Sequence, residues 1–248
     1  MYPEIILPFL DIKIFTFGLS LSIAFGLFFF MLYKLSIKTG INSNFFFGSA
    51  LPLIISTFIF SRLIFILSQW RDYKYIVSDK FLHFFLMSDY NLSFIGGVIG
   101  FVIVLGYKLI RFNQPQEKYV DTVVLAFLFA AVIGYIGAFL GGQIYGRPTS
   151  LPIGIIYKNE SANVPYTSAI IPLAILYSIG SFFLFSALYI LRELIKVEGF
   201  LGYVGIALFS LMLFIGEFFS GSDDTLSNLI TLNFTQVGAL LGLIFAVR

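Results

Sequence analysis

Polar side chains are scarce in this sequence, and a large share of them falls in two glycine-rich stretches, residues 93–100 and 134–148. The second stretch carries Tyr135, Gln143 and Arg147 among apolar neighbours. Amide and hydroxyl donors beside a guanidinium are groups that can hold a phosphate or another polar headgroup. The chemistry these residue types favour is therefore the binding of a lipid headgroup, although the same donors could simply link helices.

Glycines recur four residues apart in both stretches and again near the C-terminus. The pairs are Gly96 and Gly100, Gly137 and Gly141, Gly142 and Gly146, and Gly238 and Gly242. Small residues at this spacing let helix backbones approach closely within a bilayer. A cavity lined by glycine backbone is the second interpretation, and it draws support from the two clusters that lie beside predicted outer loops. The sequence leaves both interpretations open.

Two charged residues, Arg62 and Glu217, lie within predicted apolar spans. A charge inside a span costs about 3 kcal/mol on insertion scales, so each should face protein or water. They are either counter-ions of each other, or Arg62 holds a lipid phosphate. Together with the glycine-rich stretches they give the predicted lipid-binding residues, which are Arg62, Ser93, Gly96, Gly97, Tyr135, Gly142, Gln143, Gly146, Arg147 and Glu217.

Several classes of site are excluded by composition. The chain has no Cys, so disulfides and thiolate chemistry are absent, and its one His, His83, cannot form a poly-histidine metal site. A net charge of +2 without a basic run does not favour a nucleic-acid partner. No catalytic triad, phosphate-binding glycine loop or metal-ligand spacing is present, so we assign no catalytic residue, metal or cofactor.

The residues that could bind a ligand must be positioned by membrane-spanning helices. The chain is 59% hydrophobic and 11% charged, with a mean hydropathy of +0.97, whereas soluble domains are about a quarter charged. A span needs roughly 20 helical residues. We expect an all-α integral membrane protein with seven transmembrane helices in one domain, residues 1–248, near residues 14–33, 47–67, 92–110, 120–140, 169–191, 199–219 and 229–247.

Basic residues predict the orientation. Lys34 and Lys38, then Lys108, Arg111 and Lys118, then Arg192 and Lys196, and finally Arg248 fall on one side of the seven-span arrangement. Short loops rich in Lys and Arg stay in the cytoplasm. We therefore expect an outside N-terminus and a cytoplasmic C-terminus, with two longer outer segments at residues 68–91 and 141–168. The start Met1-Tyr2-Pro3-Glu4 lacks the features of a cleaved secretory signal.

In order and spacing these features resemble the prolipoprotein diacylglyceryl transferase (Lgt) family. The stretch at 93–100 resembles the family's Ser-Phe-His-Gly-Gly, and the stretch at 134–148 resembles Gly-Arg-x-Gly-Asn-Phe followed by Asn-x-Glu-x-x-Gly. Further likeness lies at residues 8–11, 17–18, 61–65, 121 and 209–219. The resemblance implies an Lgt-like fold in the bacterial inner membrane. It also implies an enzyme that moves diacylglycerol from phosphatidylglycerol to the lipobox cysteine of prelipoproteins.

The sequence departs from that family at the polar positions. Ile95 replaces the family's His, and Tyr135 replaces its signature Arg. Arg62, Asp121, Gly146 and Glu217 are retained, and Asp121 is interpreted as an interfacial residue rather than a catalytic one. The remaining departures are Phe17, Ala138, Gly141, Gln143, Phe209, Leu213 and Ser220.

The lost polar groups favour a degenerate, non-catalytic member of the family. Such a protein would bind a phospholipid, with phosphatidylglycerol as a candidate, or a lipoprotein, or would serve as a subunit of an assembly with other envelope proteins. The alternative is an active phosphatidylglycerol–prolipoprotein diacylglyceryl transferase with rearranged catalytic residues. The retained glycines, with Arg62, Arg147 and Glu217, keep that alternative open.

Overall fold

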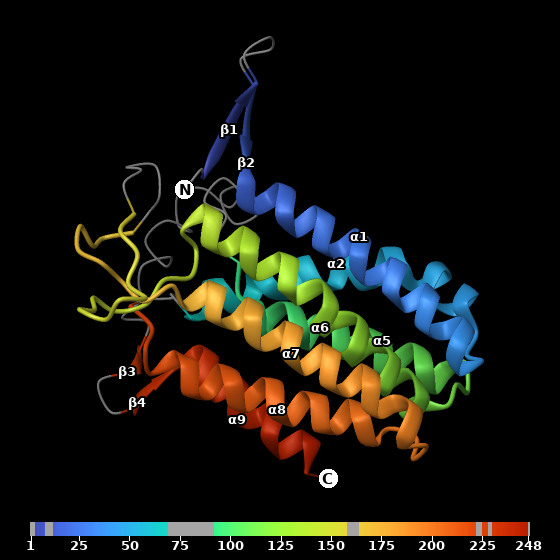
Figure 1. The fold of residues 1–248 in the computed structure, drawn as a ribbon. Helices are drawn as coiled ribbons and strands as arrows, with labels where there is room; N and C mark the ends of the chain where they lie inside the picture. The colour runs from blue at the N-terminus through green and yellow to red at the C-terminus, as the bar shows by residue number, and fades with distance from the viewer. Residues whose placement is uncertain are drawn as a thin grey trace. The chain divides into compact units, whose positions relative to one another are not determined.

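The structure, a computed structural model, describes residues 3–7, 12–68, 92–157, 164–221, 225–227 and 230–247. Its helices and strands follow one another along the chain as drawn in Figure 1. The elements are β1 (Glu4–Leu7), β2 (Ile12–Phe15), α1 (Thr16–Thr39), α2 (Ser43–Ser68), α5 (Phe94–Arg111), α6 (Gln116–Gly141), α7 (Leu173–Leu194), α8 (Phe200–Glu217), β3 (Thr225–Ser227), β4 (Ile230–Asn233) and α9 (Phe234–Ala246). Each strand pair is a short antiparallel hairpin.

Six of the described helices, α1, α2, α5, α6, α7 and α8, are long and apolar enough to cross a membrane. They confirm the mostly helical membrane fold and the first six predicted spans. The seventh predicted span, residues 229–247, contains only the 13-residue helix α9, because the β3–β4 hairpin takes its first residues. At 1.5 Å per residue α9 is about 20 Å long, shorter than a hydrocarbon core.

The chain divides into two compact units: residues 1–43, 117–224 and 239–248 form unit 1, and residues 44–116 and 225–238 form unit 2. Unit 1 contains α1, α6, α7 and α8, and unit 2 contains most of α2 together with α5. Whether the two behave as the single domain expected from the sequence stays a prediction.

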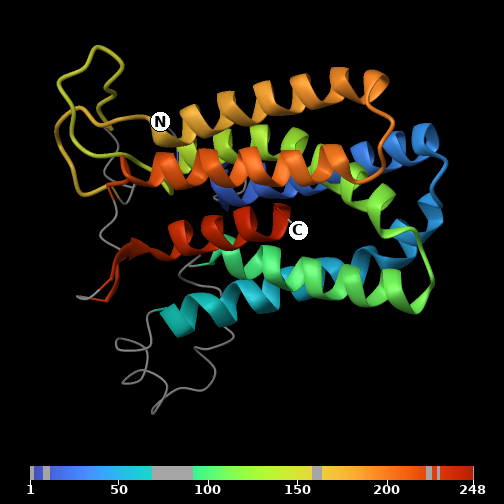
Figure 2. The ribbon, with the colours of Figure 1, turned by 90° about the horizontal axis from the view of Figure 1, so that it is seen from below.

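In unit 1, four helices pack antiparallel, so that the last residues of α1 and α7 meet the first residues of α6 and α8. The α7 and α8 helices lie side by side in both views (Figures 1 and 2). Small residues make the packing close. A Cβ on Gly137 would overlap Ser20 of α1, and one on Gly205 would lie 2.6 Å from Val124 of α6. The close-packing interpretation thus holds for these glycines.

Local signals decide where the unit 1 helices begin and end. Helix α1 stops at Gly40, whose φ of 70° places its N–H on the Ser36 carbonyl. Helix α7 begins after Pro172, which fixes its own φ and donates no hydrogen bond. Helix α8 follows Gly199, whose φ is 81°. Since Gly199 has no side chain with which to cap α8, another part of the chain must supply the acceptor.

Candidate functional site

The glycine-rich stretch at residues 93–100 begins α5 in unit 2. Ser93 caps the helix, because its Oγ accepts a hydrogen bond from the Gly96 N–H at 3.3 Å. Ser61 of α2 holds the same turn, since its Oγ donates to the Ser93 carbonyl at 2.7 Å while its own carbonyl accepts the Ser93 N–H at 3.1 Å. The predicted headgroup residue Ser93 therefore already has partners within unit 2.

The glycine face of α5 lies against α2. A Cβ on Gly96 would meet the Phe60 carbonyl and lie 2.8 Å from Ile64 Cβ. One on Gly97 would lie 3.2 Å from Thr57 Cγ2. Of the two interpretations left open for these glycines, close helix packing explains their geometry, and the space beside their Cα atoms is filled by α2.

Arg62 lies next to this contact, on α2. Its side chain is buried, with 6% of the residue exposed, and its guanidinium carbon lies 5.8 Å from the centre of the Phe65 ring. A guanidinium over an aromatic face at this distance is a cation–π contact. Arg62, Ser93, Gly96 and Gly97 thus share unit 2, whereas the other predicted lipid-binding residues belong to unit 1.

The second glycine-rich stretch ends α6. Gly142 has a φ of 69°, and its N–H donates to the Phe139 carbonyl at 3.3 Å while the Gln143 N–H donates to the Ala138 carbonyl at 2.9 Å. This pattern of two reversed hydrogen bonds closes a helix C-terminus and requires a left-handed residue, usually glycine. Gly142 is therefore a helix stop, and the Gln143 side chain that follows is exposed.

Beyond α6 the chain crosses two other segments of unit 1 at Gly146. Its N–H donates to the Ile171 carbonyl at 2.9 Å, and a Cβ there would lie 2.7 Å from that oxygen and 3.0 Å from the Phe219 carbonyl. Only glycine fits between these backbones. Arg147 continues the crossing, since its N–H donates to the Phe219 carbonyl and its Nε donates to the Ser220 carbonyl at 3.0 Å.

Two tyrosines hold the loop that follows. The Tyr166 hydroxyl donates to the Gly221 carbonyl at 3.1 Å, and the Tyr157 hydroxyl donates to the Phe139 carbonyl at 3.3 Å. Burial raises the pKa of Tyr157 to about 12, because the phenolate form would lose its hydration. Tyr157 and Ile170 form a small apolar cluster under the loop. This end of unit 1 is a folded cap whose polar groups bond mainly to backbone.

Glu217 ends α8 beside two tyrosines. The Tyr177 hydroxyl of α7 donates to Glu217 Oε2 at 3.5 Å. The Tyr135 ring of α6 lies 5.3 Å from the Tyr177 ring. A Cβ on Gly216 would overlap Tyr177, so a glycine before Glu217 lets the tyrosine reach it. Two predicted residues, Tyr135 and Glu217, are thus brought together through Tyr177, which sequence reasoning missed although it is a hydroxyl group in an apolar span.

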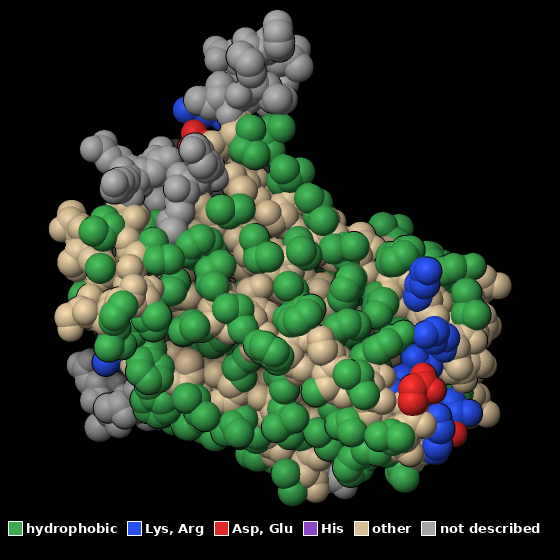
Figure 3. Space-filling view, in the orientation of Figure 1, with side chains coloured by type: hydrophobic (Ala, Val, Ile, Leu, Met, Phe, Trp, Pro, Cys, Tyr) green, Lys and Arg blue, Asp and Glu red, His purple; other side chains and the backbone are tan. Residues whose placement is uncertain are grey.

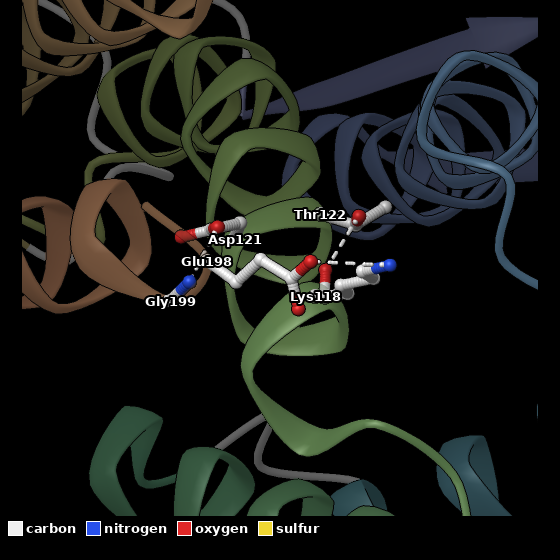
Figure 4. Close-up of polar contacts among 5 residues, drawn as sticks. All are labelled: Lys118, Asp121, Thr122, Glu198 and Gly199. Carbon is white, nitrogen blue, oxygen red and sulfur yellow. Dashed lines mark hydrogen bonds and ion pairs between the residues drawn. The ribbon is translucent and has the colours of Figure 1, made fainter. Parts of the chain in front are cut away.

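Asp121 caps α8 from a different helix. Its Oδ2 accepts the Gly199 N–H at 2.7 Å and its Oδ1 accepts the Gly202 N–H at 2.5 Å, as Figure 4 shows for Gly199. A carboxylate there satisfies orphan donors and faces the positive end of the helix dipole. Asp121, interpreted from the sequence as an interfacial residue rather than a catalytic one, therefore caps helix α8. The distance of 78 residues between Asp121 and Gly199 explains why the sequence did not reveal it.

A sequence profile of prolipoprotein diacylglyceryl transferase matches residues 4–248. The chain belongs to the prolipoprotein diacylglyceryl transferase family. The match covers nearly the whole chain, including both glycine-rich stretches and the retained Arg62, Asp121 and Glu217. With six apolar helices, membership makes this a multi-pass membrane protein of the bacterial inner membrane, resembling diacylglyceryl transferases.

Individual relatives carry the same name. The chain is 30% identical over 151 residues to a phosphatidylglycerol–prolipoprotein diacylglyceryl transferase of Clostridium tetani, covering 60% of this chain and 58% of the relative. It is 29% identical over 209 residues to that of Clostridioides difficile, covering 84% and 77%. It is 28% identical to that of Deinococcus radiodurans, over 59% of this chain and 44% of the relative. The match thus spans about half the length of several relatives.

Several of the positions that depart from the family pattern are packed in this structure, whereas the Gln143 side chain is exposed. Gly141 lies beneath Phe17, where a Cβ would be 2.9 Å from the Phe17 Cβ. Ile95 fills the space beside Gly238 in unit 2, where a Cβ would be 2.5 Å from its Cδ1. Leu213 is 6% exposed, and Phe209 packs edge-on against Phe127 with ring centres 5.1 Å apart. The described residues contain no group of three His, Asp or Glu that could hold a metal.

Proposed function

We propose that this protein is a non-catalytic member of its family that binds a phospholipid or lipoprotein in the inner membrane. The observation that carries the proposal is the packing at the departed positions, and above all Gly141 beneath Phe17. An asparagine, which the family motif has where Gly141 stands, would overlap Phe17. In this chain Phe17 therefore occupies space that an asparagine side chain at position 141 would need.

The transfer reaction sets demands that apolar side chains cannot meet. A thiol with a pKa near 8.5 must be deprotonated, and a glycerol phosphate must leave with its charge stabilised. Loss of one preorganised donor commonly lowers a rate by about 100-fold to 1,000-fold. In this chain Ile95 and Leu213 stand where the resemblance implies His and Arg, and both are apolar. Two such losses together favour a binding role.

The direct test is transfer of diacylglycerol from phosphatidylglycerol to a lipobox peptide by the purified protein. We expect a rate at least about 100-fold below that of an active relative measured in parallel. The protein should also fail to complement loss of the transferase in cells. Turnover or complementation close to the relative's, at ordinary expression, would refute the proposal.

Lipid binding is tested separately. Arg62 and Arg147 are the cations among the predicted headgroup residues, and they lie in different units. Native mass spectrometry should show retained phosphatidylglycerol, reduced in an Arg62→Ala, Arg147→Ala double variant. A matched control is Lys34→Ala, Arg111→Ala, which removes two cations outside the predicted site. Equal retention in all three proteins would remove the support for headgroup binding at these arginines.

An active transferase with rearranged residues remains the second candidate, favoured by the contact between Tyr177 and Glu217 at 3.5 Å. A carboxylate beside a phenol is a pair that can exchange a proton. If transfer is detected, Glu217→Gln should abolish it whereas Glu198→Gln should not. Activity that survives Glu217→Gln would show that this pair is not the base.

For the orientation, we propose an outside N-terminus and a cytoplasmic C-terminus. Support comes from unit 1, where Lys38, Lys118, Arg192 and Lys196 line one cavity at the same end of the helices. Reporter fusions after Lys38, Thr149 and Lys196 should read inside, outside and inside. Any other order contradicts this topology.

Association with lipoproteins or other envelope proteins is a further part of the proposal. Long exposed apolar side chains such as Phe182 and Phe183 offer a face for a partner, but apolar surface in a bilayer is also covered by lipid. Purification in mild detergent from the native membrane should recover envelope proteins in a fixed ratio. Recovery of this protein alone in several gentle detergents would contradict it.

A further inference from the structure

A cavity of about 260 Å³ opens at the end of unit 1 opposite the glycine-rich loop. It is formed by the last turns of α1 and α7, the first turns of α6 and α8, and the segment between α7 and α8. Lys118, at the start of α6, lines it, and Gly141 ends the same helix 23 residues later. At 1.5 Å per residue the two sites are about 35 Å apart.

The charges around this cavity are mainly positive. Four cations, Lys38, Lys118, Arg192 and Lys196, line it together with two carboxylates, those of Asp121 and Glu198. In Figure 3 blue Lys and Arg side chains gather at this end of the helices, next to an extensive apolar surface. A basic pocket between helices at the level of the headgroups is the form that recognition of anionic phospholipids takes in membrane proteins.

The carboxylates are already engaged. Both oxygens of Asp121 accept backbone N–H groups of α8. Glu198 pairs with Lys118 at 3.2 Å, as Figure 4 shows. Lys38 contacts an uncharged group, since its Nζ donates to the Tyr189 hydroxyl at 2.7 Å. The arrangement leaves an excess of positive charge facing the cavity.

Arg192 is the most informative of these cations. Its Nη1 is buried and has no hydrogen-bond partner among the described residues. A buried donor without a partner is unfavourable, and each such group calls for an explanation, of which a bound ion is one. The Arg192 charge also acts on the Asp121 carboxylate, but that carboxylate's acceptor sites toward α8 are occupied.

Cations in the last turn of a helix are common, because they face the negative end of the helix dipole. Lys38 and Arg192 fit that description. The dipole does not explain why cations of α1, α6 and α7 line one cavity, or why one guanidinium nitrogen is buried without an acceptor among the described residues. Both are explained by an anion held in the cavity.

We propose that this cavity binds a phosphate group, with Arg192 and Lys38 as its principal ligands. The group is supplied by the headgroup of an anionic phospholipid or by free phosphate. The site is separate from the one in the proposed function and does not depend on it.

The experiment places the purified protein in nanodiscs of phosphatidylcholine alone, of phosphatidylcholine with phosphatidylglycerol, and of phosphatidylcholine with added inorganic phosphate. Thermal unfolding and native mass spectrometry report binding. We expect an Arg192→Gln, Lys38→Gln double variant to lose the ligand-induced stabilisation and to bind about tenfold more weakly or worse. Arg192→Lys, which keeps the positive charge, should retain part of the ligand-induced stabilisation.

The matched control is Lys34→Gln, Arg111→Gln, which removes the same charge outside the cavity. If phosphatidylglycerol stabilises the protein and only the cavity variant loses this stabilisation, the phosphate belongs to a lipid. If inorganic phosphate stabilises the protein and only the cavity variant loses that stabilisation, the phosphate is a free ion. The part of the response that the cavity variant loses measures the cavity site, because the headgroup residues Arg62 and Arg147 are unchanged in that variant. The proposal is overturned if neither ligand stabilises the protein, or if cavity and control variants respond alike.

Discussion

The two ends of unit 1 handle their polar groups differently. At the end that holds Gly142, Gly146 and Arg147, donors bond to backbone carbonyls of neighbouring segments. At the other end, Lys118, Arg192 and Glu198 surround a cavity, and one guanidinium nitrogen has no partner among the described residues. The end that carries the glycine-rich motif is thus a packed cap, whereas the opposite end has a cavity lined by charged residues.

In unit 1 the family's glycine-rich motif and the charged cavity thus lie at opposite ends of the helices. The glycines of the motif remain because backbones cross at them, as at Gly146, and any side chain would collide with a carbonyl. Phe17 packs over Gly141, the position where the resemblance implies an asparagine.

Removing the Asp121 carboxylate tests the charged end most strongly. Asp121→Ala should lower the free energy of unfolding by about 2–3 kcal/mol, because two N–H groups at the start of α8 lose their acceptor. Unfolding in detergent micelles measures the change. Glu198→Gln, which affects only an exposed ion pair, should change it by less than about 1 kcal/mol. Equal effects of the two variants would mean that the cap does not hold α8.

Filling the glycine at the motif end should have the next largest effect. Gly141→Ala places a methyl group 2.9 Å from the Phe17 Cβ, and overpacking of this kind costs about 1–3 kcal/mol. The same assay should find Gly18→Ala neutral or stabilising, since nothing lies within 4 Å of a Cβ there. A Phe17→Gly change, which removes the Cβ that the new methyl group meets, should relieve Gly141→Ala; if it does not, this contact is not the constraint.

Loss of the arginine side chain in the cap should have a smaller effect. Arg147→Gln removes the hydrogen bond from Nε to the Ser220 carbonyl, and we expect a loss of about 1 kcal/mol. Hydrogen exchange should show faster opening of backbone amides near residues 146–149. Arg111→Gln, an exposed arginine that bonds to Tyr107 on its own helix, should alter stability by about 0.5 kcal/mol at most. Unchanged exchange in Arg147→Gln would assign the cap to backbone contacts alone.

Ionisation of Tyr157 should have the smallest effect on stability, because it occurs only well above neutral pH. Because the folded state raises the pKa of Tyr157 to about 12 from an ordinary value of 10.0, its proton is held more tightly when folded. The resulting stability is fully present below pH 10 and is lost as pH rises toward 12. Tyr157→Phe cannot ionise, so it should lose less stability than the unmodified protein over this interval. Parallel unfolding curves from pH 9 to 12 would contradict the assignment.

Much of the fold could be predicted from the sequence, because apolar stretches of about 20 residues have few alternatives to helices in a bilayer. The seventh span was the exception: α9 is shorter than predicted because residues 230–233 pair with β3 instead of continuing as a helix. Apolar composition alone does not separate a strand from the first turn of a helix. His83, the one histidine of the chain, lies outside the described residues.

Composition and local pattern by themselves determined the membrane class, the helices and the glycines of the motif, since these depend on hydropathy and on contacts within a few residues. Tertiary structure alone decided what the polar residues do. Asp121 meets Gly199 across 78 positions, and Arg192 joins Lys38 and Lys118 around one cavity only after three helices pack. The physical reason is that a hydrogen bond or an electrostatic field depends on distance in space, which helix packing sets and sequence separation does not.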